Sequence, residues 1–203
     1  VGLKNRGYSI GGFNATFTSN VIGGAGISSS ASFEVLIAEI MNFLYNESKI
    51  TPEEKAVVAQ YSENVYFCKP CGLLDQTAIA FGGLKRLDFS DKNKISVTEV
   101  DNSLSDYTFV LINTGGSHAN LTDEYASIPQ EMKTVAKCFG KERLVEITKE
   151  EFFDGLPKHV NKLSDREVLR AIHFYQENRS NLYSLFYYPN YTSIHMQKKQ
   201  KTW

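Results

Sequence analysis

A cluster of glycines directly before a long apolar segment constrains this chain more than any other feature. Residues 22–40 read IGGAGISSSASFEVLIAEI, so glycines are followed by three serines and then by an apolar run. Glycine destabilises helices and strands, and such a cluster therefore marks a tight turn or a close approach of the backbone to a ligand. Apolar residues cover most of the circumference of segment 32–45, which predicts a buried helix rather than an amphipathic one.

The glycine turn lies between an expected strand and this expected helix. Residues 13–18 read FNATFT and alternate as a half-buried strand does. A helix that opens in serines suits an anion, because its first N–H groups have no intrahelical partner and carry partial positive charge. A plain strand-to-helix connection with a serine cap explains the glycines alone equally well. The turn lacks the Lys-Ser or Lys-Thr of a Walker A loop and the third glycine of the dinucleotide fingerprint.

Further elements follow from local patterns. Thr51, Pro52 and Glu54 form the capping box of a second helix that is expected to run to about Phe67. Other apolar segments and their breakers predict a helix at 74–81, a strand pair at 84–89 and 95–100, a buried strand at 108–113, and helices at 130–139 and 165–177. Pro129 favours a helix that starts there over one that runs through it.

Composition narrows the class of protein. The chain has 203 residues, 42% of them hydrophobic, and a formal net charge of -1, which favours a folded domain without a nucleic-acid surface. No apolar stretch reaches transmembrane length, and the first residues do not read as a signal peptide. Three cysteines, an odd number, suit a reducing compartment, so we expect a cytoplasmic protein. Because Val1 is not a start methionine, we also expect a piece of a longer chain.

Two acidic residues stand out as candidates for chemistry. Asp75 lies among apolar neighbours in PCGLLDQTAIAFGG, residues 70–83, and is either a helix cap or a working carboxylate. Glu63 lies on the preceding expected helix, twelve positions before Asp75, where a solvated helix acid is the commonest role of a glutamate. Cys68 and Cys71 form a CxxC without the second pair that a zinc site needs.

Together these stretches resemble a known kinase family. GAGISSSAS, residues 24–32, resembles the second signature motif of the GHMP small-molecule kinases. PCGLLDQ, residues 70–76, narrows the resemblance to galactokinases, and the run from His118 to Asp123-Glu124-Tyr125 is similar to the galactokinase run that ends in Ser-Glu-Tyr. The segment VEITKEEF, residues 145–152, continues the match, which covers roughly residues 1–179.

The resemblance implies an α+β fold in two parts. Residues 1–104 would form a GHMP-kinase-like N-terminal domain without its first strands, a mixed sheet with helices of the ribosomal protein S5 domain 2-like type. Residues 105–203 would form a partial galactokinase C-terminal domain, with the division near Leu104 and an atypical tail from about residue 180. Removal of the first strands would expose a sheet edge, so we expect self-association.

The resemblance also implies an activity: transfer of phosphate from ATP to the anomeric hydroxyl of galactose, with Mg²⁺. Asp75 would be the catalytic base, Ser30 and Glu63 would hold the metal, and Gly72, Asp75 and Tyr125 would bind the sugar. The ATP phosphates would be wrapped by Gly24, Ala25, Gly26, Ile27, Ser28, Ser29 and Ser30.

Departures from the family pattern leave alternatives open. The first family motif, which begins around Gly-Arg-Val-Asn and supplies an arginine and much of the sugar site, is absent, as is the third, a glycine-rich loop. Three alternatives therefore stay open. The chain is a truncated galactokinase, either active or inactive; it is another GHMP sugar kinase, acting on N-acetylgalactosamine or arabinose; or it is a non-catalytic, galactokinase-like binding protein.

Overall fold

The computed structural model describes residues 1–24, 26–100, 107–112, 121–177 and 195–198. Chain contacts divide these residues into two compact units. The N-terminal unit contains the described residues up to Phe109, and the helical unit contains residues 121–177. Each unit is described by itself. The predicted division near Leu104 lies outside the described residues and stays a prediction.

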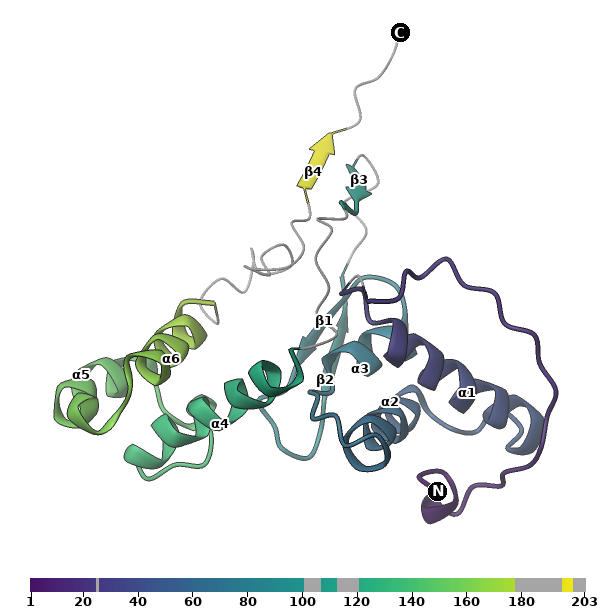
Figure 1. Cartoon of the computed structure of the whole chain (residues 1–203), viewed down its shortest axis with the longest axis horizontal. Helices are drawn as coiled ribbons and strands as arrows, with labels where there is room; N and C mark the ends of the chain where they lie inside the picture. The colour runs from purple at the N-terminus through teal and green to yellow at the C-terminus, as the bar shows by residue number, and fades with distance from the viewer. Residues whose placement is uncertain (25, 101–106, 113–120, 178–194, 199–203) are drawn as a thin grey trace, which may run out of the picture. The chain divides into compact units, whose positions relative to one another are not determined.

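The N-terminal unit is built on three helices that pack against one another: α1 (Ser29–Tyr45), α2 (Pro52–Tyr61) and α3 (Leu74–Phe81) (Figure 1). A short 3-10 turn, η1 (Lys4–Arg6), precedes them, and a π-helical segment, η2 (Ser62–Tyr66), continues α2. The predicted capping box begins α2.

A two-stranded antiparallel sheet completes this unit. After α3, Gly82 and Gly83 turn the chain with φ of 62° and 64°, angles that favour glycine. Strand β1 (Lys85–Asp88) then pairs with β2 (Ser96–Glu99), with Lys85 opposite Glu99 and Asp88 opposite Ser96. The predicted strand pair is confirmed, and so is the α+β class of the fold.

Helix α1 departs from the expectation of burial on all sides. Its buried residues, Ala31, Val35, Ala38 and Asn42, form one stripe. Phe33 and Phe43 are 52% and 73% exposed although both are large and apolar. This stripe packs on the neighbouring helices α2 and α3. Apolar side chains outside this stripe, such as Phe33 and Phe43, have no such cover within the described residues and stay exposed. The prediction of a fully buried helix is therefore wrong.

The strand expected at 13–18 is also absent: residues 8–20 have no regular secondary structure. Figure 1 shows them as part of an irregular loop that leads to α1. A strand needs a hydrogen-bonded neighbour, and within the described residues no strand runs beside this segment. Phe17 instead contacts the ring of Phe33 edge-on, at a centroid distance of 5.4 Å.

The strand expected at 108–113 is shorter and less buried than its sequence suggests. Strand β3 (Tyr107–Val110) is paired with β4 (His195–Lys198) in a second two-stranded sheet. Val110, Leu111 and Ile112 are 44%, 49% and 51% exposed, so the expected burial is wrong for these residues. An unbroken apolar run indicates strand propensity but does not determine what covers the strand.

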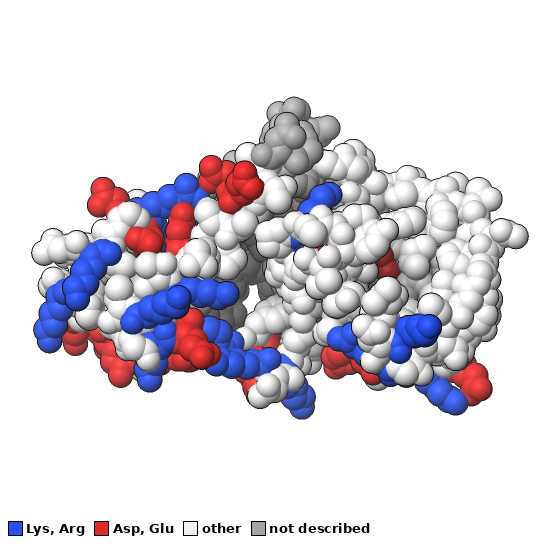
Figure 2. All heavy atoms as spheres, turned by 60° about the horizontal axis from the view of Figure 1, so that its bottom comes forward, with Lys and Arg blue, Asp and Glu red and all other residues white. Residues whose placement is uncertain are grey.

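The helical unit consists of α4 (Thr122–Cys138), α5 (Lys149–His159) and α6 (Asp165–Glu177), with 3-10 turns η3 (Leu144–Glu146) and η4 (Val160–Lys162). Its core is the buried cluster of Val135, Ala136, Leu144, Ile147, Phe152, Ala171 and Tyr175. The hydroxyl of Tyr175 donates to the carbonyl oxygens of Leu144 and Ile147, at 3.0 and 3.2 Å. Figure 2 shows acidic and basic side chains intermingled over this unit, whereas the visible face of the N-terminal unit carries few.

Pro129 does not start a helix, because α4 begins at Thr122 and runs through it. A proline inside a helix removes one backbone hydrogen bond. The packing of α4 on α6 outweighs this loss. The sequence prediction missed α5, which starts with its own capping box between Thr148 and Glu151. Among the described helices, none is long and apolar enough to cross a membrane.

Candidate functional site

The glycine–serine turn leads directly into the first turn of α1. Positive φ angles recur at alternate positions, with 74° at Gly24, 73° at Gly26 and 61° at Ser28. Ser28 is the N-cap, yet its side chain makes no capping hydrogen bond. The described residues of the turn are exposed or half-buried, and Ala25 lies outside the described residues. Turns of this kind, followed by a helix N-terminus, form concave sites lined by N–H groups for anions.

Glu63 comes from the π-helical segment that follows α2. The N–H of Phe67 donates to the carbonyl of Ser62 at 3.0 Å. The two residues are five positions apart, which is the hydrogen-bond spacing of a π-helix. Such segments are rare and recur at functional sites. Glu63 is 7% exposed, so it is not the solvated helix acid that was the alternative. No pattern in the sequence indicated the π-helical segment.

Glu34 is a second carboxylate of the site, and the sequence prediction overlooked it. It follows Ser30 by one helical turn and therefore shares its face of α1. Its Oε2 is buried and has no hydrogen-bond partner among the described residues. Burial raises the pKa of Glu34 to about 7; the negative charge of Glu63 adds to the rise, and Lys69 opposes it. The sequence feature that could have identified Glu34 is its position as the single charged residue within the apolar run 33–38.

The loop before α3 is held by side chains that surround Cys71. Asn64 Oδ1 accepts a hydrogen bond from the backbone N–H of Cys71 at 2.7 Å, and its Nδ2 donates to the carbonyl of Cys71 at 3.3 Å. Gln60 Nε2 donates to the same carbonyl, and Gln76 Nε2 donates to Cys71 Sγ at 3.6 Å. Burial raises the pKa of the Cys71 thiol, and the charges of Glu63, Glu34 and Asp75 raise it further.

Asp75 lies in the first turn of α3 and is exposed. The N-cap of α3 is Leu73, so Asp75 does not occupy the capping position that was its structural alternative. Gly72, just before it, is exposed, and a side chain built there would meet nothing within 4 Å. The carboxylate of Asp75 is thus open to a ligand.

Tyr125 belongs to the other unit. It lies in α4 and is 45% exposed. Because each unit is described by itself, its approach to Asp75 and Gly72 stays a prediction. His118 lies outside the described residues.

The predicted metal ligands carry oxygen donors of the type that a hard cation prefers, and their sharing of one ion stays a prediction. The Ser30 hydroxyl and the Glu63 carboxylate are hard donors, and the orphaned Oε2 of Glu34 is a further acceptor. Within the described residues, no three His, Cys, Asp or Glu side chains are placed to hold a metal by themselves. Mg²⁺ does not need such a cage, since it usually keeps several waters and takes ligands from substrate phosphates.

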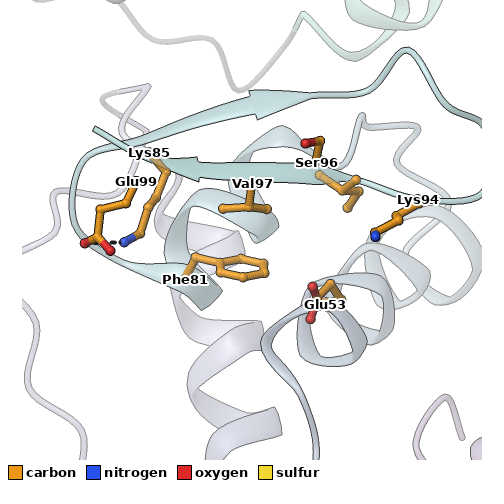
Figure 3. Close-up of a pocket in the computed structure, with 8 residues that line it drawn as sticks. Glu53, Phe81, Lys85, Lys94, Ser96, Val97 and Glu99 are labelled. Carbon is orange, nitrogen blue, oxygen red and sulfur yellow. Dashed lines mark hydrogen bonds and ion pairs between the residues drawn. The ribbon is translucent and has the colours of Figure 1, made fainter. Parts of the chain in front are cut away.

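A pocket of about 380 Å³ lies elsewhere in the same unit, beside β1 and β2. Figure 3 shows Phe81 and Val97 in it, with the ion pair of Lys85 and Glu99, 2.8 Å apart, at one end. None of its lining residues is a predicted site residue. The glycine–serine turn, Glu63 and Asp75, which the sequence singles out, all lie outside the lining of this pocket.

Comparisons with known proteins show what the chain is similar to. Residues 2–83 match the family model of the GHMP kinases N terminal domain. The chain is 35% identical to the galactokinase of Pyrococcus furiosus over 157 residues, 77% of this chain and 44% of the relative. It is 31% identical to the galactokinase of Clostridium tetani over 180 residues, 87% of this chain and 45% of the relative.

A third relative, the galactokinase of Thermotoga petrophila, is 30% identical over 185 residues, 90% of this chain and 50% of the relative. The chain thus spans about half the length of the curated relatives it matches. The family match includes the glycine–serine turn, Glu63 and Asp75, all within residues 2–83. Residues 2–83 therefore match a GHMP kinases N terminal domain, and the chain is similar to galactokinases over most of its own length.

Proposed function

We propose that this chain is an ATP-dependent sugar kinase that phosphorylates the anomeric hydroxyl of galactose. One observation supports this above all: α1, α2 with η2, and α3 pack together, so the glycine–serine turn, the buried Glu63 and the exposed Asp75 belong to one packed unit. The glycine–serine turn opens α1 one helical turn before Glu34. A phosphate-binding turn thus belongs to the same packed unit as an exposed carboxylate.

Residues Gly24 to Ser30 would bind the ATP phosphates. Backbone N–H groups at the start of α1 would donate to phosphate oxygens, and the helix dipole would favour their negative charge. Left-handed angles at Gly24, Gly26 and Ser28 turn the backbone so that it can approach the phosphates closely.

Ser30 and Glu63 would hold Mg²⁺. When bound, the ion would neutralise charge on the transferred phosphoryl group and its leaving oxygen. Glu63 lies in the π-helical segment η2. The backbone N–H of Lys69 donates to the carbonyl of Glu63 at 2.8 Å, which ties the residues after η2 back to Glu63.

Asp75 would accept the proton of the sugar hydroxyl. The hydroxyl oxygen would form a bond to the γ-phosphorus, the bond from that phosphorus to the bridging oxygen would break, and ADP would leave with the electron pair. The proton would pass to the Asp75 carboxylate. Gly72 leaves space beside this group, and Tyr125 would contact the sugar from the helical unit.

A coupled assay of ATP consumption tests this function. We expect turnover with galactose that exceeds turnover with N-acetylgalactosamine or arabinose. Turnover with one of the other sugars alone would make the chain a different sugar kinase. ATP binding without turnover on any sugar would make it a binding protein.

Location and assembly stay predictions as well. We expect a cytoplasmic protein, and we expect self-association because α1 exposes Phe33, Leu36 and Phe43. Sedimentation at several concentrations measures the assembly. A monomer at every concentration would contradict self-association without affecting the proposed activity.

A further inference from the structure

The pocket beside β1 and β2 is built by separate segments of the N-terminal unit. Glu53 comes from the first turn of α2, Phe81 from the end of α3, and Lys85 from β1. Strand β2 and the turn before it contribute further residues, among them Lys94 and Val97. The volume of about 380 Å³ lies within the range of small-molecule sites.

The charged groups of the pocket differ in how they are paired. Lys85 pairs with Glu99, directly opposite on β2, at 2.8 Å, and the Lys85 side chain is only 16% exposed. Glu53 and Lys94 form no hydrogen bond or ion pair within the residues that the structure describes. Figure 3 shows these two side chains on the other side of Phe81 from the ion pair. One end of the pocket is therefore neutralised internally, and the other presents an open cation and an open anion.

The surface between the two ends is apolar. Phe81 and Val97 line it, and each is only partly buried. An apolar group that covers them leaves water favourably. A ligand with a single charge would be repelled by either Glu53 or Lys94, whereas a ligand that carries both charges attracts both. A small zwitterion with an apolar side chain is therefore the complement of this pocket.

We propose that the pocket binds a free α-amino acid with an apolar side chain. Its carboxylate contacts the Lys94 ammonium, its ammonium contacts the Glu53 carboxylate, and its side chain covers Phe81 and Val97. This inference does not depend on the proposed kinase activity, because no predicted site residue lines the pocket. Exposed ion pairs contribute little, so the dissociation constant is expected at about 1–10 mM.

The test is a titration of the isotope-labelled full chain, followed by the NMR shifts of the β2 backbone amides. L-leucine is the ligand, and three analogues each lack one of its parts. Glycine lacks the side chain and should bind at least about tenfold more weakly, because the apolar surface stays uncovered. Isocaproate lacks the ammonium and isoamylamine lacks the carboxylate, and each should bind about fivefold more weakly because one ion pair is lost.

Two substitutions with matched controls test the charged residues. Glu53→Gln and Lys94→Gln each remove one open charge at an exposed position, so both variants are expected to fold. Glu150→Gln is the control for Glu53, since each of these residues is the second of its helix and follows a capping threonine. Lys133→Gln removes an exposed lysine of α4. The first two variants should bind leucine about fivefold more weakly, and the controls should bind it as the parent does.

Three results would overturn the inference. The first is the absence of amide shifts in β2 with leucine. The second is equal affinity for leucine and isocaproate, which would indicate a pocket for anions alone. The third is parent-like binding of leucine in Glu53→Gln and Lys94→Gln.

Discussion

Glu63, on the π-helical turn, lies close enough to Glu34, on α1, for its negative charge to raise the pKa of Glu34. Two carboxylates that share a partly buried space repel each other and lower the stability of the fold. A carboxylate whose pKa is raised by burial and a like charge, as that of Glu34 is, is often found at a functional site. Glu34 therefore points to this part of the N-terminal unit as a candidate site.

Replacement of Asp75 by asparagine tests the assignment of the base. Asparagine keeps the shape of the side chain but does not take up the proton of the sugar hydroxyl. General-base catalysis typically contributes about a hundredfold to ten-thousandfold in rate, so Asp75→Asn should lose at least about two orders of magnitude in turnover. ATP affinity should change little, because the phosphate turn is a separate element. Turnover within a few-fold of the parent in steady-state assays would make Asp75 structural.

Gly26→Ala tests the glycine–serine turn. Gly26 has φ of 73°, and a side chain in this left-handed region costs about 1–2 kcal/mol. We expect this loss in urea unfolding and, in addition, about a tenfold loss of ATP affinity from one misaligned hydrogen bond to a charged phosphate. Gly7→Ala is the matched control, since Gly7 has φ of 82° and open space around it. Equal ATP affinity in both variants would argue against the phosphate role.

The two capping boxes allow a separate test of each unit. Thr51→Ala and Thr148→Ala should each destabilise by about 1 kcal/mol, because each threonine accepts a hydrogen bond from a backbone N–H at the start of its helix. Hydrogen exchange should become faster in α2 for the first variant and in α5 for the second. Faster exchange throughout the chain in either variant would mean that the two units unfold together.

Tyr175 predicts alkaline sensitivity of the helical unit. Burial, and then the charge of Glu151, raises the pKa of its hydroxyl from 10.0 to about 12. The folded state thus holds the proton more tightly than the unfolded state. The associated stability is present below pH 10 and is lost as the pH rises through about 12.

Tyr175→Phe removes both the titrating group and its two hydrogen bonds. The variant should be about 1–3 kcal/mol less stable at neutral pH, because the buried carbonyls of Leu144 and Ile147 lose their donor. Its unfolding free energy, measured by urea titration, should fall less between pH 10 and pH 12 than that of the parent. An identical alkaline loss in both proteins would assign the effect to other groups.

The sequence by itself determined the features that depend on neighbouring residues. Thr51, Pro52 and Glu54 begin α2 because a capping box is satisfied within one turn. The glycine–serine turn leads into α1, and Gly82 with Gly83 ends α3, because only local backbone angles decide such breaks. The motif residues that indicated the kinase family are local in the same sense.

The tertiary structure decided what depends on partners. The apolar pattern of α1 did not reveal that Phe33 and Phe43 stay exposed, because burial depends on what packs against each face. The strand expected at 13–18 had no partner, and α4 continued through Pro129 because its packing on α6 outweighs one lost hydrogen bond. Glu34 drew attention only in the folded chain, where the charge of Glu63 reaches it, since an electrostatic interaction depends on distance in space and not along the chain.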